Sequence, residues 1–239
     1  MTGLLEAAIE AYGGMERWRG VRAIDVRFNF SGAALVVKGF PRHLQPSCSI
    51  DVTQCRVVLQ RLGGDPDDRW VFTADRVWLE RRDGSLIEER HHPRHAFADH
   101  VWETRWDALH LTYFVGYAMW NYVSIPFLLA EPGFVTRELN GHDENDEHWR
   151  VLEVTYPDGV PAHTKVQKFY FGRDLLLRRM DYVTDVARGV AAHYCFDHRP
   201  YDGLMISTLR RVVSRTDNGA NVTGRTGFLL DFIDVEVRR

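Results

Sequence analysis

The segment from residue 169 to residue 213 contains three strand-like runs in succession and almost no helical pattern. The joints between these runs are short and rich in turn-forming residues, Gly172-Arg173-Asp174 and Asp202-Gly203. Turns this short bring the chain back alongside itself, so the strands that they join pair antiparallel. The segment therefore predicts a continuous antiparallel meander, and one face of such a sheet has to be buried against another element.

The same pattern extends over most of the chain. Residues 24–30 alternate between apolar and polar side chains, which is typical of a strand with one wet face. Further strand-like runs cover residues 55–62, 69–75, 76–82, 133–139, 148–157, 164–171, 175–185, 191–201, 204–215 and 227–239. Residues 3–11 have apolar side chains at helical spacing, and Gly13-Gly14 ends this short helix. We see neither a repeat nor a linker, so residues 1–239 are expected to form a single domain.

One aromatic segment, from about Pro93 to Glu131, interrupts the strands. It shows no alternation, and four large side chains recur every fourth residue on one helical stripe: Trp102, Trp106, His110 and Phe114. Gly116 and Pro126 are expected to divide the segment into two short helices. Residues 115–126 then form either a lid that opens for a ligand or a helical pair that stays packed in the core.

A sheet with one apolar face and few helices to cover it must curl around a filler. The aromatic segment is the obvious filler, because exposing Trp120 and Phe127 with the stripe would create an apolar patch larger than a soluble monomer usually tolerates. We therefore predict an α+β fold. It comprises a strongly curved antiparallel sheet of about ten strands, a half-open β-barrel, with an N-terminal helix and a central helical plug on the concave face.

Composition narrows the classes of partner. The chain has 239 residues, and its formal net charge of -3 lacks the basic excess that binding to nucleic acid requires. No run approaches the roughly 18 apolar residues of an integral membrane segment, and the first residues do not resemble an export signal. The three cysteines have neither an even count nor zinc-site spacing, which favours free thiols and a cytoplasmic location. We expect no metal and no cofactor.

Several stretches together resemble the half-open barrels of the bacterial lipoprotein carriers, the LolA-like proteins. They are "AYGGMERWRGV" before the first strand, the central helical segment, "FYFGRDLLLRRMDYV", "HYCFDHRPYDGLMISTLRRV" and the closing strand "FIDVEVRR". The similarity spans nearly the whole chain in the order of its elements. It implies a concave apolar cavity under short helices, and in those carriers such a cavity shelters acyl chains.

The expected function is binding of a hydrophobic or amphipathic small molecule, or a lipid, in an aromatic-lined cavity. On the strand of residues 175–185, Met180 and Tyr182 share one face, and we expect Tyr194 of the next strand to join them with the charges outside. The predicted ligand-binding residues are Phe28, Phe30, Trp78, Trp106, His110, Phe114, Tyr117, Trp120, Tyr122, Met180, Tyr182 and Tyr194.

An alternative is an enzyme of secondary or lipid metabolism that uses the same cavity, with proton transfer by His110 or Asp107. These residues lie in the His-rich stretch "HHPRHAFADHVWETRWDALH", which lacks a His-Glu-x-x-His pair. His110 is equally compatible with a buried neutral imidazole that makes one hydrogen bond.

The polar "NGHDENDEHW" lacks the register of a calcium loop and predicts a hairpin tip. Whether a reaction is catalysed, the ligand and any protein partner stay open at this point.

Overall fold

A computed structural model describes residues 3–216, 219–220 and 222–239. The strands are β1 (Ala23–Ser31), β2 (His43–Leu44), β3 (Ser47–Asp51), β4 (Arg56–Gln60), β5 (Arg69–Thr73), β6 (Arg76–Glu80), β7 (Leu86–His91), β8 (Val135–Glu144), β9 (Glu147–Thr155), β10 (Val166–Phe171), β11 (Leu177–Thr184), β12 (Gly189–Tyr201), β13 (Leu204–Thr216), β14 (Gly219–Ala220) and β15 (Phe228–Arg238). The helices are α1 (Leu4–Ala11), α2 (Met15–Arg19), α3 (Ala33–Lys38) and α4 (Ala108–Ser124), with 3-10 turns η1 (Pro93–Phe97) and η2 (Phe127–Ala130).

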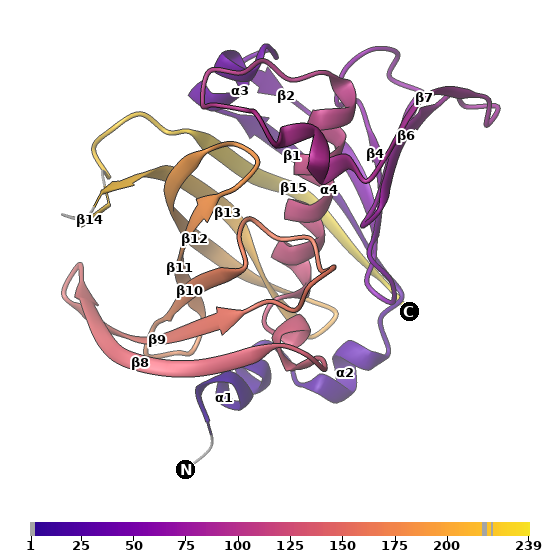
Figure 1. The fold of residues 1–239 in the computed structure, drawn as a ribbon. Coiled ribbons are helices and arrows are strands. Elements are labelled where there is room, and N and C mark those ends of the chain that lie inside the picture. The colour runs from indigo at the N-terminus through magenta and orange to yellow at the C-terminus, as the bar shows by residue number, and fades with distance from the viewer. Residues whose placement is uncertain (1–2, 217–218, 221) are drawn as a thin grey trace.

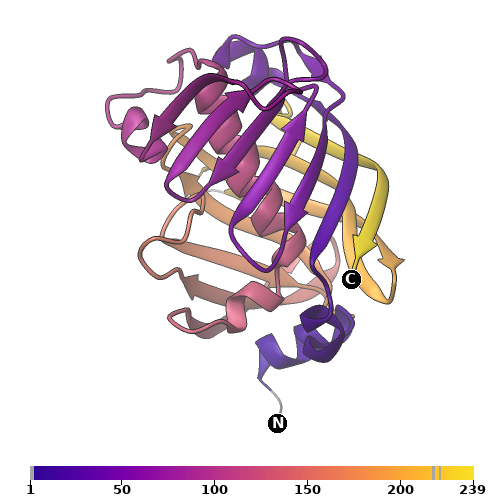
Figure 2. The same ribbon diagram turned by 90° about the vertical axis from the view of Figure 1, so that its right-hand side faces the viewer.

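One antiparallel sheet organises the molecule. Its strand order is β7-β6-β5-β4-β3-β1-β15-β13-β12-β11-β10-β9-β8, while β2 pairs with β1 and β14 with β13. Among the described strands no ladder joins β7 to β8, so the sheet is strongly curved but does not close. Figures 1 and 2 show α4 running inside the curve, behind β3–β7 in the second view. The predicted half-open barrel of α+β class, with a helical plug on its concave side, is confirmed.

Strand β1 joins the two halves of the sheet through β3 on one side and β15 on the other. Its alternation decides which face is buried: Ile24, Val26, Phe28 and Phe30 are nearly inaccessible, and the residues between them are more exposed. A bulge in the pairing with β15 follows Arg27, and such bulges bend a strand and increase its twist. The centre of the sheet therefore supplies the aromatic floor of the core.

Helix α4 is continuous, so the expected division at Gly116 is wrong. Every residue from 109 to 124 except His110 is buried, which is the pattern of a helix enclosed on all sides. Gly116 is tolerated because it lies against Phe72 of β5, where a Cβ would overlap the phenylalanine. The helix ends at Ser124 because the residue before Pro126 is extended. With no break at Gly116, the main reason for expecting a lid over residues 115–126 disappears.

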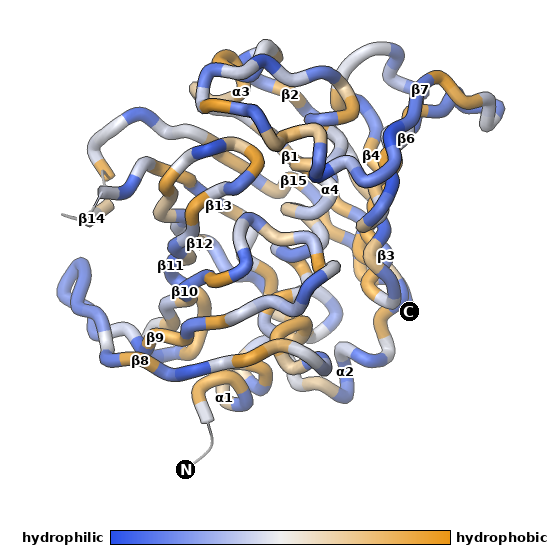
Figure 3. Tube along the Cα trace, viewed as in Figure 1, coloured by the Kyte–Doolittle hydropathy of each residue, from blue (hydrophilic) through white to orange (hydrophobic). Residues whose placement is uncertain are grey.

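Some short elements were missed because their patterns are weak. The edge strand β7 is almost fully exposed and carries no buried face, and α3 is only six residues long. Helix α3 nevertheless matters, because Gly32 and Gly39 turn the chain at its two ends and place it over the concave side. The predicted polar hairpin tip is confirmed at the β8–β9 turn, where Figure 3 shows a hydrophilic stretch.

The N-terminal helices close the lower end of the curve. The predicted short helix is observed as α1, and Gly13 and Gly14 after it adopt positive φ angles. Trp18 of α2 stacks on Phe127 of η2 with ring centroids 4.5 Å apart, which joins this end to the plug. None of the helices within the described residues is both long enough and apolar enough to span a bilayer.

Candidate functional site

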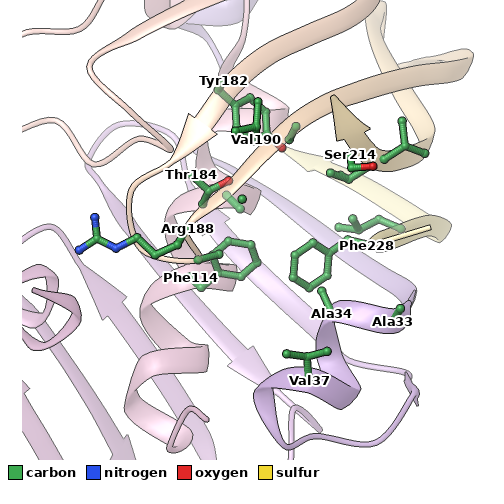
Figure 4. Close-up of a pocket in the computed structure, with 18 of the residues that line it drawn as sticks. Ala33, Ala34, Val37, Phe114, Tyr182, Thr184, Arg188, Val190, Ser214 and Phe228 are labelled. Atoms are coloured by element: carbon green, nitrogen blue, oxygen red, sulfur yellow. The ribbon is translucent and has the colours of Figure 1, made fainter. Parts of the chain in front are cut away.

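A cavity of about 540 Å³ lies between α3, α4 and the strands β11, β12, β13 and β15. Figure 4 shows Ala33, Ala34 and Val37 of α3 facing residues of the opposite strands across it. Its size is within the range of roughly 300–1,000 Å³ that is usual for small-molecule sites. Its lining is largely apolar. The position follows from the fold, because α4 fills one half of the curve and leaves space beside the other half.

Four of the predicted ligand-binding residues line this cavity: Phe30, Phe114, Tyr122 and Tyr182. They come from three elements distant in sequence, β1, α4 and β11, which the curvature of the sheet brings together. Phe114 packs against Phe228 of β15 with ring centroids 5.1 Å apart. The sequence pattern did not indicate the contribution of α3 or of Phe228.

Five further predicted residues are buried around the cavity but do not line it: Phe28, Trp106, Tyr117, Trp120 and Met180. They belong to the same hydrophobic core as the cavity wall. Trp120 faces the α2 side of α4, where it borders a separate, smaller pocket. The structure therefore gives these residues a packing role.

Trp78 does not lie in the cavity, and the prediction for it is corrected. Its neighbours Val77 and Leu79 are buried toward α4, so Trp78 points to the convex face. There its Nε1 donates a hydrogen bond to Glu80 over 2.8 Å, and the Arg76 guanidinium lies over its ring.

Tyr194 is also on the convex face, away from Met180 and Tyr182, which it was expected to join. Tyr194 pairs with Arg179, while His193 pairs with Met180. Directly opposed residues share a face, and a shift of one residue exchanges the faces. The Tyr194 hydroxyl donates to Glu144 over 2.6 Å. His193, rather than Tyr194, therefore shares the concave face with Met180 and Tyr182.

His110 and Asp107 form the N-terminal cap of α4 and do not line the cavity. The backbone N–H of His110 donates to Asp107 over 2.8 Å, and the imidazole Nδ1 accepts from the Asp107 backbone N–H over 3.2 Å. Arg90 also donates to Asp107, over 2.7 Å. Burial opposes ionisation, but the hydrogen bonds from His110 and Arg90 hold the pKa of Asp107 well below its usual range. The geometry is that of a capping box.

Sequence reasoning missed a buried chain of tyrosines and histidines beside the cavity. His163, from the loop before β10, lies 3.0 Å from the Tyr117 hydroxyl through Nδ1 and 3.1 Å from the Tyr122 hydroxyl through Nε2. The Tyr182 hydroxyl lies 3.1 Å from Nδ1 of His193. Tyr182 also stacks on His163 with ring centroids 4.0 Å apart. Two cavity-lining tyrosines are thus held by buried imidazoles.

Both imidazoles are neutral at ordinary pH. Burial lowers the pKa of His163 to about 3, and nearby Arg94 adds to the effect. Burial likewise lowers the pKa of His193 well below its usual value, with Arg210 contributing. The sequence held one sign of the buried position of His193. In β12 this histidine shares a face with Ala191 and Cys195, which are both small side chains.

Arg210 of β13 is a second feature that the sequence did not reveal. Its side chain is 3% exposed, and its guanidinium lies 4.6 Å from the ring centroid of Tyr122. It donates to the backbone carbonyl of Tyr122 over 3.0 Å and to the Cys195 sulfur over 3.1 Å. In the string "LRRVV", nothing distinguishes this arginine from the outward-facing Arg211.

The fold and the cavity together define a class: an open antiparallel half-barrel around a helical plug, with an apolar space on the concave side. A LolA superfamily protein from Nitrosomonas europaea has a similar structure, with 11% sequence identity, a TM-score of 0.56 and coverage of 99% of this chain and 92% of that chain. A domain described as an outer membrane lipoprotein-sorting protein from Vibrio parahaemolyticus is similar with 10% identity, a TM-score of 0.52 and coverage of 98% and 91%.

The fold is therefore LolA-like, as the resemblance in the sequence implied. No protein-family model matches the sequence, and no curated protein matches it. At these identities the likeness concerns the fold, so the function has to be argued from the site.

Proposed function

We propose that the protein binds a hydrophobic or amphipathic small molecule, of the lipid class, in the cavity between α3, α4 and β11–β15. The observation that carries the proposal is the cavity itself, about 540 Å³ with a mostly apolar lining on the concave side of the sheet. A ligand with an apolar chain that binds there gains about 25 cal/mol for each square ångström of apolar surface that it buries.

The similarity of the fold to a domain described as lipoprotein-sorting supports the proposal at the level of shape. Proton transfer by His110 or Asp107 receives no support from the geometry, since both residues cap α4 outside the cavity. Binding requires no reacting group, so it accounts for the observed site with the fewest assumptions. The predicted cytoplasmic location remains a prediction.

Native mass spectrometry of freshly purified protein tests the proposal, together with titration of the emptied protein by an environment-sensitive lipid probe. Ala191→Phe adds a ring to the cavity wall and is expected to abolish binding of the probe. Val166→Phe adds the same ring at an exposed position of β10 that does not line the cavity, and should leave binding unchanged. Probe binding that is equal in both variants would reject this cavity as the site.

A further inference from the structure

Arg210 carries a buried positive charge that the protein does not neutralise with an acid. Among the described residues no aspartate or glutamate lies within ion-pair distance of its guanidinium, and its Nε has no hydrogen-bond partner. Buried charges are normally paired, because removing an ion from water without a counterion is costly. Asp181 of β11 points to the convex face instead, where it pairs with Arg179.

Groups around Arg210 offset only part of this charge. Tyr122 lies in the last turn of α4, and the carbonyls at a helix C-terminus carry about half an elementary negative charge. The face of the Tyr122 ring adds a weaker attraction. Cys195 contributes no charge, because burial raises the pKa of its thiol even though Arg210 opposes the shift. A net positive charge is left in the core.

His193 is a second unsatisfied group beside it. Its Nδ1 contacts the Tyr182 hydroxyl, while its Nε2 is buried and has no partner. In the register of the sheet, His193 pairs with Val212 and Arg210 pairs with Leu230, and both of these partners line the cavity. His193 and Arg210 do not themselves line the cavity, but each is buried behind its wall, on a strand next to a residue that does line it.

We infer that Arg210 and His193 hold the anionic head group, a carboxylate or a phosphate, of an amphipathic ligand whose apolar chain fills the cavity. The inference rests on the proposed function and specifies the ligand class. A guanidinium has a planar set of donors that matches two oxygens of either group, and the His193 imidazole can supply a further donor. Tyr122 and Tyr182 line the cavity and contact Arg210 and His193 respectively, so the inference requires their rings to move aside when the head group binds.

Matched ligands test this arrangement: a long-chain fatty acid, an alkyl phosphate and an uncharged alcohol, all with the same alkyl chain, titrated by calorimetry. The wild-type protein is expected to bind at least one anion about tenfold or more tightly than the alcohol. Arg210→Gln should lose this preference and still bind the alcohol. The matched control is Arg225→Gln, which removes an exposed cation that lines the cavity and should preserve the preference. The two anionic arms distinguish carboxylate from phosphate.

The outcomes separate this inference from the proposed function. Equal binding of anions and alcohol by the wild type, or a preference that survives in Arg210→Gln, overturns the head-group site and leaves an apolar cavity. If Arg225→Gln loses the preference for anions, the head group lies near Arg225 at the exposed part of the cavity. This result also overturns the head-group site at Arg210 and His193. If no ligand of the series binds the wild type, the proposed function fails. Should Arg210→Gln not fold, Arg210→Lys keeps the charge and must keep the preference for an anion.

Discussion

Gly116 of α4 lies directly against Phe72 of β5, and no space is left for a side chain at this glycine. This contact sets the distance between the plug and the sheet. Glycine is a poor helix former, so its presence in the middle of a buried helix calls for a packing reason. The close approach of Phe72 supplies that reason.

Gly116→Ala is therefore expected to destabilise the protein, although alanine is the better helix former. The gain in helix propensity of about 1 kcal/mol is outweighed by overpacking, which costs about 1–3 kcal/mol in a tight core. Thermal unfolding should show a lower Tm than for the wild type. In the double variant Gly116→Ala/Phe72→Leu, the two losses should be less than additive. A Tm raised by Gly116→Ala alone would refute the contact.

Asp107→Ala should lower the free energy of unfolding by about 1 kcal/mol through loss of the α4 cap. Asp107→Ser retains an oxygen that can accept the His110 backbone hydrogen bond, and it should recover most of the loss. Denaturant unfolding measures both variants. Neither change should alter the affinity for a lipid probe, because Asp107 does not line the cavity. A large change in affinity with unchanged stability would instead indicate a direct role in the site.

The buried His163 predicts that stability falls in mild acid. Because its pKa is lowered to about 3 while an unfolded imidazole titrates near 6.5, the unfolded state takes up the proton first as the pH falls. The stability that the protein gains from keeping His163 neutral is fully present above about pH 6.5. It is lost progressively as the pH falls toward 3. His193, shifted in the same direction, acts in the same window.

His163→Phe should therefore flatten the dependence of Tm on pH between about 6.5 and 4, even if its Tm at neutral pH is lower. The slope is the measurement that matters, because the variant also removes hydrogen bonds to Tyr117 and Tyr122. An unchanged slope would show that the imidazole is not kept neutral in the folded protein.

The convex face contains a buried ion pair that should be sensitive to removal of one partner. Arg179 donates two hydrogen bonds of 2.7 Å to Asp181, also contacts Glu144, and lies over the ring of Tyr170. Arg179→Met leaves a buried carboxylate with less compensation and should cost about 3–5 kcal/mol in denaturant unfolding. Arg179→Met/Asp181→Leu should regain much of this loss. Equal losses in the single and the double variant would argue against a coupled pair.

The sequence predicts the curved sheet and the central plug well, because a strand with one buried face, such as β1, shows a period of two. In β1 that period alone identifies Phe28 and Phe30 as core residues. The pattern does not show which face of a strand points inward, however, and in β12 the concave face carries His193 in place of the expected Tyr194. A glycine within a helical pattern likewise indicates either a helix break or a close packing contact. For Gly116 the packing against Phe72 in the folded structure decides for the contact.

The candidate site was harder to predict than the fold, because its charged member looks like a surface residue. Arg210 and Arg211 are neighbours in a strand and point to opposite faces, and alternation does not show which of them turns inward. The depth of Arg210 follows from the curvature of the sheet around α4, which depends on the whole chain.

The missing ladder between β7 and β8 has a consequence for the size of the cavity. In a closed barrel, strand number and stagger fix the diameter. Here the two halves of the sheet meet through β1 and β15, and α4 runs between them with its side chains buried in the common core. The width of the space between them is therefore determined by side-chain volume along one helix, and substitutions in α4 can resize the cavity while every strand pairing stays the same.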